Sequence, residues 1–399
     1  MDSIVSIAKG SDIKKTVIDS INLLGGIKNF VKKGEVVFIK PNLMAQFCSP
    51  YIVDVDVIKT VVEECIKAGA KTVYVGENPM SEIKGKEVLD FTGYSDILEK
   101  SGAKILKLDE EEYIKVNSGN AKYFKEFNLP KKFVESDVFI DLAKMKTHVI
   151  EGVTLCFKNY QGLLMHSEKR KMHNNSEGSL SNKFIDMVLF KKPNLCIIDA
   201  FHCLEGLGPM FGDLKKMNLI ISSNDILSID HCASKVMGFN PLKIPQIKTA
   251  VDYFGKPNYK ILGKKINSVK QKFKTAHFDI PCSLGNLKFY SDIPDKGSEG
   301  ILKLALSLFF SYSKIFEKEF SKLKGLSIVY GGLNHKIKDD TILLFGDTAI
   351  ASKKFTEAKK YIEFKGNPPT EWFSVLRTLS KEFDLKIIGF MTSALGERK

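Results

Sequence analysis

The first part of the chain alternates short apolar runs with segments of helical periodicity. Apolar runs of strand length lie at Ile4–Ala8, Val36–Ile39 and Thr72–Val75. Helices are expected over Ile13–Leu24 and Val57–Ala68. Strands separated by helices of about 10–15 residues indicate βαβ units and a parallel sheet. The same pattern continues with a helix over Leu89–Lys100 and strands over Lys104–Leu108 and Val138–Leu142.

The helix predicted over Val57–Ala68 carries signals at both of its ends. Asp54 or Asp56 precedes it, and a carboxylate there accepts hydrogen bonds from the first free backbone amides. Gly69 follows it and suits the left-handed conformation that often ends a helix. The sequence therefore predicts where this helix begins and ends.

The pattern weakens in the middle of the chain. Residues 143–192 lack clean periodicity and are rich in Lys, His, Gly and Asn. A stretch of this length is more often functional than a simple connector. Strands are then expected at Leu195–Ile198 and Leu219–Ser222, on either side of a glycine-rich loop, before a helix over Ile226–Met237.

A composition change predicts the last boundary. Residues 264–299 mix lysines, single hydrophobic residues and prolines. The predicted fold class is α/β, with two parallel-sheet lobes over residues 1–135 and 136–265 and a linker and small C-terminal α/β region over residues 266–399. The elements expected in this last part are helices at Gly300–Leu323 and Thr370–Phe383 and strands at Leu326–Val329, Thr341–Phe345, Tyr361–Phe364 and Leu385–Ile388.

Composition narrows the class of protein. Of the 399 residues, 44% are hydrophobic and 27% are charged, which excludes collagen-like, disordered and disulfide-scaffold proteins. The net charge of +13 comes from lysine, because the sequence has only three arginines. Proteins that read nucleic-acid bases rely on the planar guanidinium group. The charge therefore favours attraction of small anions, or a bias of composition, over a nucleic-acid partner.

Cysteine usage and hydropathy indicate a compartment. The seven cysteines include no C-x-x-C pair, which argues against a disulfide framework or a zinc ribbon, and no iron–sulfur cluster is expected. Reduced thiols indicate the cytoplasm. The N-terminus lacks the features of a signal peptide. The longest apolar stretch, Ile301–Tyr312, is too short to span a bilayer, and its helix fits packing on a core better than lying on a membrane.

The first candidate site follows the Val36–Ile39 strand directly. Lys40, Pro41 and Asn42 come at its end, and in parallel sheets ligands bind beyond the carboxyl ends of strands. The ammonium of Lys40 and the amide of Asn42 would hold a phosphate or a carboxylate there. A simple turn, in which Pro41 stops the strand, is the alternative.

The densest group of candidate residues follows the strand at Val138–Leu142. Histidine moves protons near neutral pH, and a lysine kept uncharged by burial can act as a nucleophile or form a Schiff base. Clustered ammonium groups also cradle an anion. A solvated basic loop is the alternative, and Cys156 stands without a second thiol at metal spacing, which argues against a structural metal site. The group comprises Lys144, Lys146, Thr147, His148, Lys158, Asn159, His166, Lys169 and His173.

A glycine-rich segment with acidic residues forms the third candidate site. Gly206 and Gly208 suit close approach of the backbone to a ligand, with amides that hold an anion. Asp199 and Glu205 offer general-base or metal-binding carboxylates, with His173 as a further possible metal ligand. The segment lacks the third glycine of a dinucleotide fingerprint. A plain turn explains the glycines equally well.

Together these stretches resemble an uncharacterised family known as domain of unknown function 362. The resemblance covers about residues 3–265, in order and with similar spacing. Many relatives also carry a ferredoxin-like cluster domain, for which this sequence has no cysteine set. The resemblance implies a fold and a site rather than a reaction. It rests on Lys40–Asn42, residues 144–148, Thr154, Lys158–Asn159, Gly162, Asp199–Gly212 and Ser228–Gly238.

The histidine and lysine spacing also looks similar to that of lactate-racemase-type proteins. His148 precedes Lys158 by ten residues, and His173 follows Lys158 by fifteen. The resemblance implies that Lys158 tethers a nickel-pincer nucleotide, that His173 ligates nickel and that His148 moves a substrate proton. That family has a further acid/base histidine upstream, whereas no histidine precedes His148 here.

These observations lead to one main expectation. It is an enzyme that binds a small anionic metabolite, a carboxylate or a phosphate, in a cleft between the two lobes. The expected catalytic residues are His148, Lys158 and His173. The expected substrate-binding residues are Lys40, Asn42, Lys144, Lys146, Thr147, Asn159, Gly206 and Gly208.

Two other functions remain open from the sequence. The first is a metal- or cofactor-binding carrier without turnover, including a nickel-pincer-type site, in which His173, Asp199 and Glu205 bind a divalent metal. The second is a nucleic-acid-binding protein, which the charge alone suggests.

Overall fold

The structure is a computed structural model. It describes residues 3–80, 83–173, 178–311, 319, 321–366, 369 and 372–385. The chain forms two compact units. The first comprises residues 1–169 and 180–276, and the second comprises residues 170–179 and 277–399.

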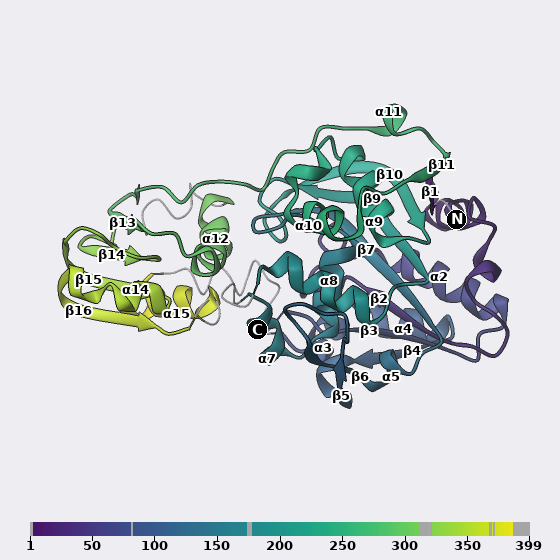
Figure 1. The fold of residues 1–399 in the computed structure, drawn as a ribbon, viewed down its shortest axis with the longest axis horizontal. Helices are drawn as coiled ribbons and strands as arrows, with labels where there is room; N and C mark the ends of the chain where they lie inside the picture. Colours follow the sequence, from purple (N-terminus) through teal and green to yellow (C-terminus); the bar gives the residue numbers. More distant parts are fainter. Residues whose placement is uncertain are drawn as a thin grey trace. The chain divides into compact units, whose positions relative to one another are not determined.

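A mixed sheet of nine strands forms the centre of the first unit. Its pairs from β7 through β2 and β3 to β4, and from β7 to β9, are parallel, whereas β10 runs antiparallel to β9 and β1. In spatial order the strands are β11 (Tyr259–Gly263), β1 (Ser3–Lys9), β10 (Asp213–Ser223), β9 (Leu195–Glu205), β7 (Val138–His148), β2 (Val36–Pro41), β3 (Thr72–Glu77) and β4 (Ala103–Lys107), and β8 (Gly152–Thr154) pairs with the end of β7 (Figure 1).

Helices connect these strands as the periodicity predicts. Asp54 caps α2, where its side chain accepts from the amide of Asp56, and Gly69 ends that helix with a φ of 95°. Both end signals read from the sequence are therefore confirmed. The helices of this unit are α1 (Ile13–Asn22), α2 (Val55–Ala68), α3 (Gly85–Thr92), α4 (Tyr94–Lys100), α5 (Lys131–Val134), α6 (Cys156–Asn159), α8 (Leu180–Phe190), α9 (Ile226–Val236), α10 (Pro245–Phe254) and α11 (Ile266–Val269), and α7 (His166–His173) runs from this unit into the second.

The pairing of β2 with β7 gives the first unit a single sheet. The register places Lys40 beside Asp141 and Pro41 beside Leu142, so strands from residues 1–135 and 136–265 share one hydrogen-bonded ladder. The sheet buries the apolar faces of α1 and α2, including Val17, Val57 and Val61. Residues 1–135 and 136–265, which were expected to form two lobes, thus contribute strands to one sheet. A small antiparallel hairpin of β5 (Tyr113–Asn117) and β6 (Glu126–Pro130) was not predicted.

The strand predicted to end at Leu142 continues to His148. Every residue of β7 is buried, including Lys144 and Lys146. The solvated basic loop was the alternative for the whole group from Lys144 to His173, and it is wrong for Lys144 and Lys146, which are buried in β7 and hydrogen-bond to polar groups of the protein. In a parallel sheet buried on both faces, a strand can include charged residues when each of them has a polar partner.

The second unit has its own sheet of five strands, in which all but one pair are parallel. The predicted strand Leu385–Ile388 and the end of the helix Gly300–Leu323 fall largely outside the described residues. Two sheets with covering helices confirm the α/β fold class. The strands are β12 (Ser283–Leu284), β13 (Leu287–Tyr290), β14 (Leu326–Val329), β15 (Ile337–Phe345) and β16 (Thr356–Phe364), and the helices are α12 (Lys296–Ser311), α14 (Asp347–Ala351) and α15 (Trp372–Glu382).

Hydropathy within the described residues gives one further result. No helix in those ranges has both the length and the apolar character needed to cross a membrane.

Candidate functional site

Charged side chains gather at the carboxyl ends of neighbouring parallel strands. Lys40 lies at the end of β2, Glu77 at the end of β3, Lys144 and Lys146 near the end of β7, and Asp199 on β9. Because β3, β2, β7 and β9 are consecutive parallel neighbours, these ends meet at one edge of the sheet. With Lys158 and Lys169, these lysines form a set that we call the lysine cluster: Lys40, Lys144, Lys146, Lys158 and Lys169.

Lys40 forms a buried ion pair with Glu77. Its Nζ lies 2.6 Å from Glu77 Oε2, and the two side chains are 1% and 6% exposed. The same Nζ donates to the carbonyl of Pro41 at 2.9 Å and to Asn159 Oδ1 at 3.0 Å. Gly162 passes so close that a Cβ there would lie 1.7 Å from Glu77 Oε1. Only glycine fits at that position without displacing the pair.

Lys144 forms a second buried ion pair, with Asp199. The Nζ–Oδ2 distance is 2.6 Å, and both side chains are 0% exposed. The other hydrogen bonds of the carboxylate come from the amides of Asp54 at 2.9 Å and Phe201 at 3.0 Å. Such a pair survives burial because every oxygen and the ammonium are engaged.

Lys146 is buried without a carboxylate among its hydrogen-bond partners. Its Nζ donates to Asn42 Oδ1 at 2.8 Å and to the carbonyl of Tyr51 at 2.6 Å, with Met44 Sδ at 3.0 Å. Burial lowers the pKa of Lys146 well below its usual value, and the charges of neighbouring lysines, Lys144 first, lower it further. This amine is thus held by neutral oxygens in a positively charged environment.

Lys158 and Lys169 complete the lysine cluster. Burial lowers the pKa of Lys158 to about 8, while the Glu151 carboxylate acts in the opposite direction. The Nζ of Lys158 donates to Gln161 and lies 5.7 Å from the centre of the Phe184 ring. Burial likewise lowers the pKa of Lys169 to about 7. Lys158 retains some solvent accessibility, whereas Lys169 is buried and donates to the carbonyls of Asn78 and Pro79.

His148 and Glu151 lie at the turn that follows β7. His148 Nδ1 accepts from the amides of Ile150 at 3.1 Å and Glu151 at 3.3 Å, which favours the tautomer with its proton on Nε2. The buried Glu151 carboxyl accepts from Ser181 Oγ at 2.8 Å. Burial raises the pKa of Glu151. The turn therefore connects a histidine to a carboxyl that acts electrostatically on Lys158.

The two predicted asparagines connect the charged groups to one another. Asn159 Nδ2 donates to Asp141 Oδ1 at 2.6 Å and to the carbonyl of Lys40 at 2.9 Å. Asn42 Oδ1 accepts from Lys146 Nζ, and Asn42 Nδ2 lies 3.5 Å from Asn159 Oδ1. The structure thus brings Lys40, Asn42 and Asn159 together, as parts of one buried hydrogen-bond network.

The glycine-rich segment packs against the protein instead. The amide of Gly206 donates to the carbonyl of Lys274 at 3.1 Å, and that of Gly208 to the carbonyl of Gly206 at 2.7 Å. A Cβ at Gly208 would lie 2.1 Å from the Thr147 carbonyl oxygen, and Thr147 Oγ1 donates to the Gly206 carbonyl at 2.8 Å. Close packing of backbone on β7 explains these glycines, and both amides are engaged within the protein.

Two of the residues predicted to share a metal, Asp199 and Glu205, have different lysine partners. Asp199 pairs with Lys144, whereas Glu205 pairs with Lys215 at 2.9 Å. His173 ends α7 and groups with the second unit. Among the described residues, Asp141, Cys156 and Cys196 form a group of possible metal ligands, with donor atoms within 4.8 Å of one another.

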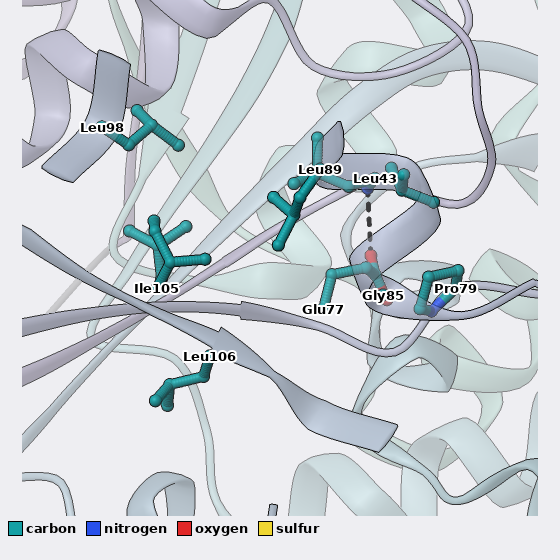
Figure 2. A pocket seen from close by; sticks show the side chains of 10 residues that line it. Leu43, Glu77, Pro79, Gly85, Leu89, Leu98, Ile105 and Leu106 are labelled. Atoms are coloured by element: carbon teal, nitrogen blue, oxygen red, sulfur yellow. Dashed lines mark hydrogen bonds between the residues drawn. The ribbon is translucent and has the colours of Figure 1, made fainter. Parts of the chain in front are cut away.

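A small cavity adjoins the Glu77 carboxylate. Figure 2 shows Leu43, Pro79, Leu89 and Ile105 around it, with Glu77 accepting from the amide of Leu43 at 3.1 Å. Its volume is ≈ 10 Å³, about the space that one water needs. It is a packing void between β3, β4 and α3 rather than a metabolite pocket.

Several buried acidic residues of the site were not predicted. Glu77 lies two residues beyond the predicted strand Thr72–Val75, at a strand end like that of Lys40. Asp141 interrupts the apolar run of β7, and an acidic residue inside such a run is the signal that would have found it. Glu151 follows β7 in a turn, where the sequence gives no signal of burial, and its buried carboxyl accepts from Ser181.

Comparisons with known proteins agree with the resemblance read from the sequence. Residues 37–235 match the family model described as "Domain of unknown function (DUF362)". A thylakoid-associated protein of Synechocystis sp. is 29% identical over 231 residues, which cover 56% of this chain and 69% of that protein.

Two solved structures match part of the chain at low similarity. The lactate racemase apoprotein of Thermoanaerobacterium thermosaccharolyticum matches with a TM-score of 0.40 at 12% identity, over 59% of this chain and 57% of that one. A protein of Thermotoga maritima matches with a TM-score of 0.32 at 11% identity, over 48% of this chain and 51% of that one. The chain spans little more than half the length of each, and no residue assignment depends on these two likenesses.

Proposed function

We propose that the chain, whose residues 37–235 match the DUF362 family model, is an enzyme that binds a small carboxylate or phosphate metabolite at the lysine cluster. Lys146 and Lys158 would hold the anion, and Lys158, with His148 nearby along the chain, would transfer a proton. The lysines paired with Glu77 and Asp199 would hold this arrangement rigid.

The observation that supports the proposal is the imbalance of charge. Lys40 and Lys144 each have a carboxylate partner, whereas the hydrogen-bond acceptors of Lys146 and Lys169 among the described residues are neutral oxygen and sulfur atoms. Buried amines without a counterion have lowered pKa values. An anion that arrives beside them supplies the missing negative charge and stabilises their protonated forms.

Lys158 is the member of the lysine cluster best suited to act on a substrate. With a pKa of about 8 it is present in both protonation states near neutral pH, as a general acid or base requires. It is also the member that keeps some solvent accessibility. His148 lies three residues before Glu151, whose charge acts on Lys158, and the proposal assigns proton transfer to Lys158 and His148.

The proposal is tested with anion binding and proton uptake. Thermal-shift and calorimetric titrations of the full chain use inorganic phosphate and a panel of short dicarboxylates. Binding beside Lys158 raises its pKa, so at pH 8 the protein should take up protons, up to roughly half a proton from this group. Titration in two buffers of different ionisation enthalpy measures that uptake.

Variants separate charge from proton transfer. Lys158→Met should lose anion-induced stabilisation, whereas Lys158→Arg should keep binding but lose the proton uptake, since a guanidinium does not titrate near pH 8. Lys243→Met, at an exposed lysine of the same unit, is the matched control. Equal stabilisation by every anion in the wild type, Lys158→Met and His148→Ala would contradict the proposal.

The cofactor implied by the second resemblance does not enter this proposal. Lys158 Nζ donates to Gln161 and lies over the Phe184 ring. A cytoplasmic location for the reaction follows from the expectation of reduced thiols, and it is tested by fractionation of cells expressing the chain.

A further inference from the structure

Two thiols and a carboxyl meet beneath the lysine cluster. Asp141 on β7 and Cys196 on β9 are directly paired positions of adjacent parallel strands, so their side chains emerge on the same face of the sheet. Cys156, the first residue of α6, packs on that face. A donor atom of each lies within 4.8 Å of the others, and all three residues are 0% exposed.

One oxygen of this group has no partner within the described protein. Asp141 Oδ1 accepts from Asn159 Nδ2 at 2.6 Å, whereas Asp141 Oδ2 is buried and makes no hydrogen bond. A buried polar atom without a partner is strongly unfavourable, and an unseen ion is one of its regular explanations. This oxygen, Asp141 Oδ2, therefore belongs to the carboxyl that lies beside the Cys156 and Cys196 thiols.

We propose that Asp141 Oδ2, Cys156 Sγ and Cys196 Sγ bind one divalent transition-metal ion of the zinc or ferrous class. Metal–sulfur bonds of about 2.3 Å and metal–oxygen bonds of about 2.0–2.2 Å in a tetrahedron place ligand atoms roughly 3.3–3.8 Å apart. That spacing lies within the 4.8 Å observed here. Thiolate donors select zinc or iron over magnesium or calcium.

The surrounding contacts position the ligands. Asp230, on α9, accepts from the backbone amides of Cys156 at 2.9 Å and Phe157 at 3.0 Å, which holds the start of α6 against that helix. Asn159 orients the Asp141 carboxylate from its other oxygen. Oriented ligands supported by such outer hydrogen bonds are typical of metal centres. Asn159 also contacts Lys40, so this centre would adjoin the lysine cluster without sharing a ligand with it.

Binding exchanges protons for the metal. Both thiols lose their protons to solvent as the two metal–sulfur bonds form, and Asp141 binds as a carboxylate, releasing its proton if it carries one. Two thiolates, one carboxylate and the divalent ion leave a net charge of −1. A fourth coordination position remains for water, as in sites with three protein ligands.

The test supplies the metal while the protein folds, because the group is buried. The full chain is produced in minimal medium with cobalt, a spectroscopic substitute for zinc, and separately with zinc or iron. We expect close to one equivalent of metal by elemental analysis. The cobalt protein should show thiolate-to-cobalt charge transfer and the intense visible bands of a tetrahedral site.

Variants assign the ligands. Cys156→Ala and Cys196→Ala should each lose the charge-transfer band and at least 90% of the metal, and Asp141→Asn should bind at least tenfold more weakly. Cys65→Ala, at a buried thiol of α2, is the matched control and should keep both. Circular dichroism shows which variants are folded.

The wild-type protein alone can overturn the proposal. Folded wild-type protein with less than a tenth of an equivalent of every metal would do so, as would equal loss of metal in Cys65→Ala. A disulfide between Cys156 and Cys196 in the non-reduced peptide map would also overturn it. None of these outcomes depends on Lys158, so the proposed function stands or falls separately.

Discussion

Replacing Asp199 with asparagine should leave the ammonium of Lys144 buried and without a counterion. The pair is 0% exposed on both sides at 2.6 Å. Removing one partner of a buried ion pair costs about 3–5 kcal/mol of folding free energy. The loss is large because, among the described residues, the other hydrogen-bond partner of the Lys144 ammonium is the neutral Ser49 Oγ at 3.3 Å.

The double variant Lys144→Met/Asp199→Asn provides the physical test of that reasoning. It removes both charges and keeps the volume of the lysine stem, so it should recover most of the stability lost in Asp199→Asn. Glu63→Gln is the matched control. The Lys14–Glu63 distance of 2.7 Å is close to that of the buried pair, but these side chains are 55% and 22% exposed. Its loss should stay below about 1 kcal/mol.

Urea unfolding followed by circular dichroism measures these changes. For a unit of this size, about 3–5 kcal/mol corresponds to a fall in Tm of roughly 6–20 °C. A loss below about 1 kcal/mol in Asp199→Asn, or a double variant no more stable than it, would refute the buried ion pair.

Two further predictions concern other parts of the site. Gly162→Ala should cost about 1–3 kcal/mol in urea unfolding, because its Cβ would meet Glu77 Oε1 at 1.7 Å and Lys40 Nζ at 2.6 Å, whereas Gly119→Ala, with no atom within 4 Å, should be nearly neutral. Lys169 has a pKa of about 7 in the folded protein and near 10.5 when unfolded. Between these pH values the unfolded state binds more protons than the folded state. The stability of the wild-type protein should therefore rise with pH from about 7 to 10.5. The slope from this group is at most about 1.4 kcal/mol per pH unit, and Lys169→Met should remove it; an unchanged slope in that variant would assign it to other groups.

Local sequence signals predicted most of the first unit correctly. The apolar runs placed β1, β2, β3 and β4, and capping residues located the ends of α2. The helix expected over Ile226–Met237 is α9, and Asp225 caps it by accepting from the amide of Ser228. These signals succeed because periodicity and caps depend on residues within one or two turns of each other.

The site was predicted only in part, and burial is the reason. The sequence identified Lys40, Lys146 and Asn159 as members of one group, since each follows a predicted strand end or resembles a family motif. It gave no indication that Glu77 neutralises Lys40 or that Asp141 adjoins two thiols. Partners separated by tens of residues become neighbours only through the pairing of β2, β3, β7 and β9.

Cys156 shows most directly which features the sequence determined and which only the tertiary structure decided. In the sequence it has no second thiol at metal spacing, and forty residues separate it from Cys196. The parallel register of β7 and β9 places Cys196 beside Asp141, and α6 brings Cys156 to them. The order of residues therefore determined the strands, the helices and the supply of lysines. Which charges are paired, which amines remain without a counterion and which thiols meet were decided by tertiary contacts, because the energy of a buried charge depends on neighbours that chain order does not specify.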